Sequence, residues 1–209
     1  MKVAVIAANG KAGTLLTAQA TQRGHDVTAI MRKDHDTPAA HTLVKDVFDL
    51  TREDLAGFDV ILDAFGAWSE DALAGHSTHL AHLVDILQGS PARLLVVGGA
   101  GSLYVNPEHT VTVMQTEGFP PEVAPLAQAM QDGLDVLRRS EGVKWTYLSP
   151  AADFQADGPE GHAYVFGGEE LSTDANGACV ISYADYARAM LDVAESNEHI
   201  GERISVRNA

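Results

Sequence analysis

Short apolar runs alternate with longer amphipathic stretches along most of the chain. The first two runs, residues 3–6 and 27–31, are almost wholly apolar, as is typical of parallel strands that are covered on both faces. Between them, residues 11–23 carry apolar side chains at helical spacing. This alternation continues and predicts an α/β fold with a parallel sheet. Further strands are predicted at residues 43–44, 58–62, 93–97, 145–148 and 203–206, with short ones at residues 164–166 and 178–181. Further helices are predicted near Thr51 and at residues 77–88, 126–139 and 183–195.

The turn after the first predicted strand carries two glycines, Gly10 and Gly13. Dinucleotide-binding turns have this arrangement, because small residues let the backbone approach a pyrophosphate and the N-terminus of the next helix stabilises the anion. The usual fingerprint has a third glycine where this chain has Ala7, so an ordinary tight turn is the alternative. The strand before the turn and the helix after it favour a cofactor site, whose expected residues are Ala7, Asn9, Gly10, Lys11, Ala12 and Gly13.

Arg32 ends the second predicted strand. In a dinucleotide-binding fold, the adenine-side ribose lies over the tip of this strand. An acidic residue there binds the 2′-hydroxyl of NAD, whereas an arginine suits the 2′-phosphate of NADP. No acidic residue occupies the tip, since Asp34 comes two residues later. Arg32, with Asn9 and Lys11 converging from the turn, therefore predicts that NADP(H) is favoured over NAD(H). The alternative is an ordinary solvated arginine.

Residues 7–13, Ala-Ala-Asn-Gly-Lys-Ala-Gly, resemble the Gly-Ala-Thr-Gly-x-x-Gly turn of the atypical short-chain dehydrogenases and reductases. Five further segments continue the resemblance in order, at residues 63–67, 94–103, 148–152, 174–177 and 181–187. Together they are similar to the NmrA-like, NAD(P)-binding proteins that include bacterial NADH-flavin reductases. The resemblance covers nearly the whole chain. It implies one Rossmann-type domain over residues 1–209, with a doubly wound, mostly parallel sheet, helices on both faces and an irregular substrate-side segment at residues 153–181.

The resemblance also assigns residues to the cofactor. It places Asp46 and Val47 beside the adenine, with the Asp46 carboxylate able to accept the exocyclic amine; capping of the next turn is the alternative role of Asp46. Phe65, Gly66 and Ala67 follow a strand, at the edge where open α/β sheets bind ligands, although packing in the core is favoured for the Phe65 side chain. The other expected cofactor residues flank the nicotinamide and are Gly98, Gly99, Pro150 and Ala151.

Ser102 and Tyr104 are the candidate catalytic residues. Typical short-chain dehydrogenases combine a serine with a Tyr-x-x-x-Lys pair, in which the lysine lowers the pKa of the tyrosine for proton transfer. Here Glu108 stands where the lysine would be, and Pro107 disfavours the helix that carries the pair. The usual catalytic pair is therefore absent. Ser102 could orient a carbonyl and Tyr104 could donate a proton, although an unassisted phenol with a pKa of about 10 is a poor acid at neutral pH. A structural role stays open for both.

The overall composition excludes several classes of protein. The chain of 209 residues has a formal net charge of −15 and a pI near 4.8, which would repel a nucleic-acid backbone. Its single cysteine, Cys179, excludes an intramolecular disulfide and a cysteine-based zinc site. No apolar run approaches the roughly 20 residues of a membrane span, and no secretory signal is apparent. His76, His79 and His82 share one predicted helix, but only Asp85 accompanies them, so no metal site is expected. We expect a cytoplasmic monomer or homodimer.

The predicted function is that of an NAD(P)H-dependent reductase, which transfers hydride from NADPH to a flavin or a similar planar small molecule. The loop at residues 110–125, with Met114 and Phe119, would flank that substrate or simply pack on its own scaffold. Hydride transfer needs orientation and exclusion of water more than a strong protein acid, so the absent catalytic pair is compatible with it. Two alternatives stay open: an NmrA-like sensor of the NADP/NADPH ratio with little turnover, and an epimerase or isomerase that holds its cofactor tightly.

Overall fold

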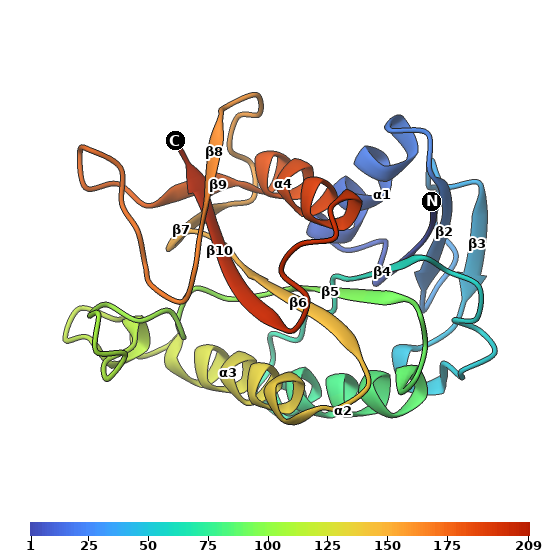
Figure 1. The fold of residues 1–209 in the computed structure, drawn as a ribbon, viewed down its shortest axis with the longest axis horizontal. Helices are drawn as coiled ribbons and strands as arrows, with labels where there is room; N and C mark the ends of the chain where they lie inside the picture. The colour runs from blue at the N-terminus through green and yellow to red at the C-terminus, as the bar shows by residue number, and fades with distance from the viewer.

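A central sheet of eight strands runs through the molecule in the order β3-β2-β1-β4-β5-β6-β10-β8 (Figure 1). The computed structural model describes residues 1–209. All neighbouring strands pair in parallel except β8, which is antiparallel to β10. The strands are β1 (Lys2–Ile6), β2 (Asp26–Met31), β3 (His41–Val44), β4 (Val60–Asp63), β5 (Arg93–Val97), β6 (Lys144–Ser149), β8 (Tyr164–Gly167) and β10 (Glu202–Asn208).

Two helices cover each face of the sheet (Figure 1). Helices α1 (Lys11–Gln22) and α4 (Tyr183–Glu195) pack together on one face, and α2 (Gly75–Leu87) and α3 (Ala124–Arg139) pack together on the other. This arrangement follows from the chain order, because each helix that joins two parallel strands must cross one face of the sheet. The predicted doubly wound α/β fold is confirmed. None of the helices is both long enough and apolar enough to cross a bilayer.

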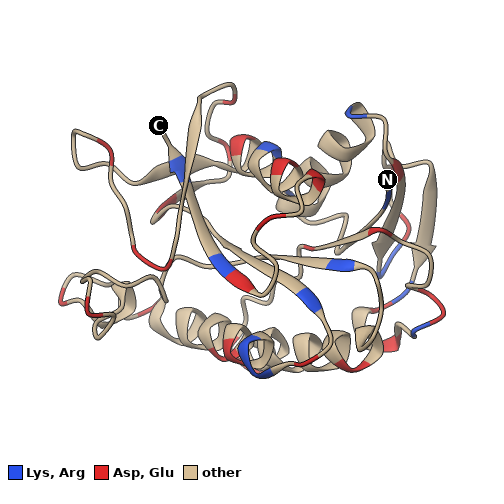
Figure 2. Ribbon diagram, in the orientation of Figure 1, with Lys and Arg blue, Asp and Glu red and all other residues tan.

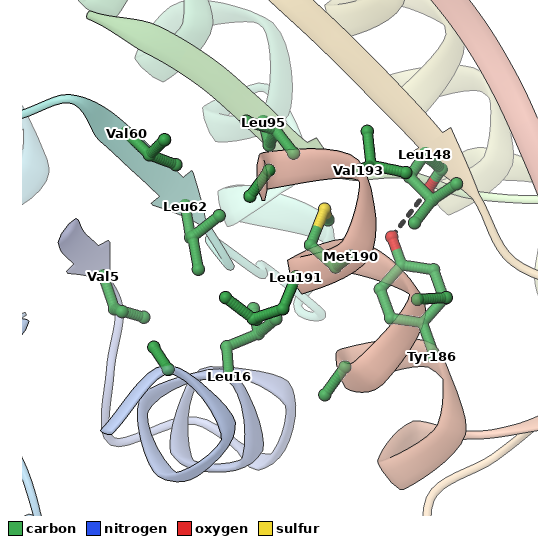
Figure 3. Packing of buried hydrophobic residues seen from close by; sticks show 14 of the residues in the cluster. Val5, Leu16, Val60, Leu62, Leu95, Leu148, Tyr186, Met190, Leu191 and Val193 are labelled. Atoms are coloured by element: carbon green, nitrogen blue, oxygen red, sulfur yellow. Dashed lines mark hydrogen bonds between the residues drawn. The ribbon is translucent and has the colours of Figure 1, made fainter. Parts of the chain in front are cut away.

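The central strands β1, β2, β4, β5 and β6 each contribute to two separate hydrophobic cores. In β1, Val3 and Val5 face the core under α1 and α4, whereas Ala4 and Ile6 face the core under α2 and α3. Since successive side chains of a strand point to opposite faces, burial on both faces explains why the strand is continuously apolar. In the first core, Leu16 of α1 and Leu191 of α4 lie side by side against the sheet, and Tyr186 donates a hydrogen bond to the carbonyl oxygen of Leu148 at 2.6 Å (Figure 3).

The structure differs from the sequence-based prediction near residue 51. No helix begins at Thr51; residues 52–57 form turns, and the 3₁₀ helix η1 (Val47–Asp49) precedes them. The reciprocal bonds between Thr51 and Asp54 are those of a helix start, but the segment ends one turn later at Gly57, whose φ is +85°. The Asp54 carboxylate accepts hydrogen bonds from the Thr51 backbone N–H at 2.7 Å and hydroxyl at 2.8 Å, and from Lys45 at 2.6 Å.

The segment at residues 153–181 contains the short strands predicted at residues 164–166 and 178–181, and one strand that was not predicted. Strands β7 (Asp153–Gln155) and β9 (Val180–Ser182) form a separate two-stranded parallel sheet, and β8 joins the edge of the main sheet. Two further 3₁₀ helices, η2 (Glu70–Ala72) and η3 (Val113–Gln115), lie in the long connections after β4 and β5. These connections leave the carboxyl ends of the central strands and border the cavity described below.

Candidate cofactor and substrate site

A cavity of about 1600 Å³ lies along the carboxyl ends of the central strands. Its wall is formed by the loops that follow β1, β2, β3, β4, β5 and β6, together with the beginnings of α2 and α3. The chain proceeds from β1 toward β3 on one side and from β4 toward β6 on the other, and ligands bind in open α/β sheets at such a switch point. The volume exceeds the roughly 300–1,000 Å³ of a pocket for one small molecule, so the cavity can hold a dinucleotide and a second ligand.

The turn between β1 and α1 is tightly folded around Ala7. This residue has φ +56°, in the left-handed region that favours glycine, and its carbonyl oxygen accepts a hydrogen bond from Gly10 N–H at 2.9 Å. A Cβ atom on Gly13 would lie only 2.2 Å from the same oxygen. Gly13 is therefore required by the packing of the helix against the turn, behind the cavity wall.

The N-terminus of α1 faces the cavity without a side-chain cap. The N-cap residue is Gly10, which has no side chain that could accept a hydrogen bond from the first turn. No acidic residue stands in that turn. The first N–H groups of a helix have no acceptor within the helix, and together with the helix dipole they bind anions. Asn9 and Lys11 line the cavity beside them. An uncapped terminus with an adjacent lysine fits the pyrophosphate of a dinucleotide.

The carboxyl ends of β2 and β3 form the next part of the wall. Arg32 is exposed, lines the cavity and makes no ion pair within the protein. Lys45 also lines it, but its ammonium group is paired with Asp54 at 2.6 Å. Asp46 and Val47 are both on the wall, and the Asp46 carboxylate accepts a hydrogen bond from Phe48 N–H at 3.0 Å. Asp46 thus caps the 3₁₀ helix η1 and also lies on the wall of the cavity.

A buried polar cluster supports the loop that follows β4. The Asp63 carboxylate accepts hydrogen bonds from Phe65 N–H at 3.1 Å and from His79 Nε2 at 2.8 Å. The Phe65 ring stacks on the His79 imidazole, with 4.1 Å between the ring centroids, and it also lines the cavity. Nε2 of His76 lies 3.1 Å from the carbonyl oxygen of Ala67. This cluster holds Phe65, Gly66 and Ala67 in place at the cavity.

The three histidines of α2 have different surroundings. His76 lines the cavity, and its burial lowers the pKa of its imidazole below 6.5 despite the hydrogen bond to Ala67. It is therefore largely uncharged at neutral pH. His79 binds Asp63, and His82 lies 2.9 Å from the carbonyl oxygen of Leu50. Among residues 1–209, no group of three or more His, Cys, Asp or Glu side chains has a metal-binding arrangement.

The glycines after β5 are enclosed by the protein itself. A Cβ atom on Gly98 would lie 2.3 Å from Cε1 of Tyr147, and one on Gly99 would lie 2.9 Å from Sδ of Met130. The Tyr147 hydroxyl accepts a hydrogen bond from Gly99 N–H at 3.1 Å, and complete burial raises the pKa of this phenol to about 12. Both glycines line the cavity, opposite the first turn, as do Pro150 and Ala151 after β6.

Ser102 and Tyr104 do not meet at the cavity. Ser102 is buried in the wall, where the Arg203 guanidinium donates to its hydroxyl at 3.4 Å and to its carbonyl oxygen at 3.3 Å. Tyr104 lies outside the wall and stacks on His109, with 4.5 Å between the ring centroids. Its backbone pairs with residues 169–171, through a hydrogen bond from Tyr104 N–H to Glu169. Of the two candidate catalytic residues, only Ser102 lies on the cavity wall, because Tyr104 is held in contacts with residues 169–171.

Apart from Gly13, which lies behind the wall, all of the expected cofactor-binding residues line the cavity. Phe119 lines the cavity, whereas Met114 does not. Sequence reasoning missed several residues on the wall. Lys45 and Trp68 could have been found, because each directly follows a predicted strand or motif. The others gave no local signal and are His76, Met130, Phe154 and Tyr183.

Comparisons with known proteins agree with this geometry. A family model for NAD(P)H-binding proteins matches residues 7–197. YwnB of Bacillus subtilis, an uncharacterised protein, is 41% identical over 214 residues, which cover 99% of this chain and 98% of YwnB. The crystal structure of a candidate NADH-flavin reductase from Streptococcus pneumoniae is 45% identical, with a TM-score of 0.98 and 100% of both chains covered. The crystal structure of a candidate epimerase from Bacteroides thetaiotaomicron is 29% identical, with a TM-score of 0.84. The match covers 99% of this chain and 96% of that chain.

These relatives share the whole fold, and the family model spans the turn, the cavity loops and α4. As the resemblance to atypical short-chain dehydrogenases and reductases predicted, this chain belongs to the NAD(P)H-binding family.

Proposed function

We propose that the protein is an NADPH-dependent reductase that passes hydride to a flavin or a similar planar acceptor. One observation carries the proposal: a single cavity joins the anion-binding turn at Gly10 to an apolar wall that includes Phe119 and Met130. Such a wall suits a flat ring placed beside the nicotinamide. The Streptococcus pneumoniae relative, described as a candidate NADH-flavin reductase, supports the same reaction class.

The protein's own contribution to this reaction is binding and orientation. A bound reduced nicotinamide would supply the hydride. The α1 N-terminus and Lys11 would bind the pyrophosphate, and the loops at Gly98 and Pro150 would hold the ring end of the dinucleotide. The apolar wall would exclude water and orient the acceptor. A reduced flavin can take its proton from solvent, so this role does not require the absent Tyr-x-x-x-Lys pair.

The proposed preference for NADPH depends on Arg32. Its guanidinium is exposed on the wall next to β2 and has no carboxylate partner, so it is free to bind a phosphate in the bidentate manner that arginine favours. Asp34, the nearest acidic residue along the chain, does not line the cavity. We also propose the cytoplasm as the location, although a structural relative from Burkholderia pseudomallei, 31% identical, is described as a candidate exported protein.

A redox sensor is the second candidate function. It is favoured by the position of Tyr104 outside the cavity and by the engagement of Ser102 with Arg203, since a sensor binds dinucleotide without needing a proton donor. The epimerase alternative has support from the Bacteroides relative, but it requires a pair of groups for proton transfer. Tyr104 lies off the wall, so Ser102 would need a different partner.

The test is a titration with NADPH and NADH, followed by oxidation assays with FMN, FAD and riboflavin. Tight NADPH binding with rapid, acceptor-dependent oxidation is the expected result. Tight binding without turnover on any acceptor would favour the sensor. No binding of either dinucleotide would contradict both functions. A Gly13→Trp variant, whose side chain would collide with the Ala7 carbonyl oxygen, should lose dinucleotide binding, and reactions without protein give the background of non-specific oxidation.

A further inference from the structure

Basic side chains are confined to one half of the cavity. Lys11, Arg32 and Lys45 are the lysines and arginines of its wall, and they follow β1, β2 and β3. In the order β3-β2-β1-β4-β5-β6 these strands form one side of the sheet. In the proposed orientation of the dinucleotide, this side receives the adenine and the phosphates.

The other half of the cavity is apolar and acidic. Its wall includes Phe119, Leu126 and Met130 from the loop before α3 and from α3 itself, and its charged side chains are those of Asp71 and Asp153. Both carboxylates are exposed. His76 lies in the same half, but its burial lowers the pKa of its imidazole, so it adds little positive charge near neutral pH.

The cofactor would use all of the available positive charge. NADPH brings a pyrophosphate and a 2′-phosphate, and Lys45 is already neutralised by Asp54 at 2.6 Å. Only Lys11 and Arg32 then remain for these phosphates. A phosphate on the second ligand would have only carboxylates, those of Asp71 and Asp153, as charged side chains on the wall of its half. The surrounding field is also negative, since the chain has a net charge of −15 and acidic positions are spread over its helices and loops (Figure 2).

We propose that the acceptor is an uncharged planar ring that carries no phosphate, of the riboflavin type rather than the FMN type, and that Asp71 and Asp153 discriminate against the phosphate. This inference rests on the proposed reductase function. Two electrons and a proton pass to the acceptor ring as hydride, a second proton follows from water, and the oxidised dinucleotide leaves. The two carboxylates act on specificity alone and take no part in the transfer.

The test compares riboflavin with FMN, which have the same isoalloxazine ring and differ by one phosphate. The dissociation constant of each is measured by quenching of flavin fluorescence on protein saturated with NADP⁺. We expect FMN to bind roughly three- to tenfold more weakly than riboflavin at low salt, because its dianionic phosphate would be repelled by the two exposed carboxylates. The difference should shrink at high salt, because exposed charges are screened.

Matched variants separate the site from the overall charge. The double variant Asp71→Asn with Asp153→Asn should bring the dissociation constant for FMN close to that for riboflavin. The dissociation constant for riboflavin should stay nearly unchanged. The control is Glu141→Gln with Glu198→Gln, which changes the net charge equally. These exposed residues precede β6 and β10, so they lie near the amino ends of the strands, whereas the cavity lies at the carboxyl ends. The control variant should keep the full difference between the two flavins.

Two results would overturn the inference: FMN binding as tightly as riboflavin to the wild-type protein, or an equal loss of discrimination in the control variant. Failure of the proposed function looks different. Selective binding of riboflavin without NADPH oxidation would reject the reductase and keep the binding preference. Rapid oxidation with equal binding of both flavins would keep the reductase and reject the preference.

Discussion

Nε2 of His79 lies 2.8 Å from Oδ2 of Asp63, and both side chains are buried, with 3% and 1% of their surface exposed. Nδ1 of His79 lies 2.7 Å from the carbonyl oxygen of Gly75. Both ring nitrogens therefore face hydrogen-bond acceptors, the Asp63 carboxylate and the Gly75 carbonyl oxygen. The second oxygen of Asp63 accepts from Phe65 N–H. The pair thus fastens α2 to the end of β4 and holds the loop at residues 63–67 against the cavity.

His79→Leu should destabilise the protein strongly, because it leaves the Asp63 carboxylate buried without its partner. We expect a loss of about 3–5 kcal/mol in the free energy of unfolding, measured in urea. The control is His41→Leu, which breaks the exposed His41–Asp26 pair of 3.2 Å and should cost less than about 1 kcal/mol. Equal losses in the two variants would show that burial of the Asp63–His79 pair does not matter.

Gly13→Ala should disrupt the first turn more than Gly10→Ala. The added Cβ would lie 2.2 Å from the Ala7 carbonyl oxygen at position 13 but 3.3 Å at position 10. We expect about 1–3 kcal/mol of destabilisation for Gly13→Ala, as for overpacking elsewhere, with a clear loss of NADPH affinity. Thermal unfolding and a fluorescence titration check the two effects. If Gly10→Ala proved the more harmful, contact with the cofactor would outweigh the packing of the turn.

Arg32→Glu should weaken NADPH far more than NADH. Loss of charge-assisted hydrogen bonds to the 2′-phosphate predicts a rise of about tenfold or more in the dissociation constant for NADPH. Lys33→Glu is the matched control, since Lys33 is exposed and does not line the cavity. It should change both constants little. Equal weakening of NADPH and NADH by Arg32→Glu would mean that the guanidinium does not contact the 2′-phosphate.

Tyr104→Phe should leave turnover and NADPH binding almost unchanged, because the Tyr104 ring lies outside the cavity against His109. Ser102→Ala should alter KM for the acceptor, since Ser102 is on the wall. Steady-state kinetics with a fixed concentration of NADPH separate the two. A large loss of kcat in Tyr104→Phe would return the tyrosine to the catalytic machinery and imply that its loop moves when substrate binds.

Glu169 should make stability depend on pH in the acid range. Burial alone would raise the pKa of its carboxyl, but the guanidinium groups of Arg203 and Arg138 hold the pKa below 4.5. The pKa of the Glu169 carboxyl is lower in the folded protein than in the unfolded chain. The stabilisation that the ionised carboxylate gives is therefore fully present above pH 4.5, and it is lost as the pH falls through the pKa of the folded protein. Glu169→Gln should therefore be less stable than the wild type at pH 7, with a difference that shrinks in acid.

Urea unfolding across the pH range measures this dependence. Glu170→Gln is the control, because Glu170 is 57% exposed and pairs only with an exposed histidine, His109. The free energy of unfolding of Glu170→Gln should differ little from that of the wild type at every pH. A difference for Glu169→Gln that stays constant down to pH 3 would contradict the assignment of the lowered pKa.

Much of the fold could be predicted because its signals are local. Strand β1 is read from its apolar run, and α1 from the spacing of its apolar residues. The predicted helix near Thr51 is wrong: Thr51 and Asp54 bond to each other as at a helix start, but the segment ends at Gly57, whose φ is +85°. Strand β7 was not predicted, because it is only three residues long and is stabilised by pairing with β9 across the 24 intervening residues 156–179.

By itself, the sequence determined the order of strands and helices, the turn at Gly10 and Gly13, and the basic residue at the tip of β2. Each of these depends on residues within one short stretch, where hydrophobic period and turn chemistry act. Only the tertiary structure decided that His76 and Tyr183 line the cavity while Tyr104 does not. A cavity wall is assembled from loops far apart in the chain, and the direction of each side chain is set by the packing of its element against the others.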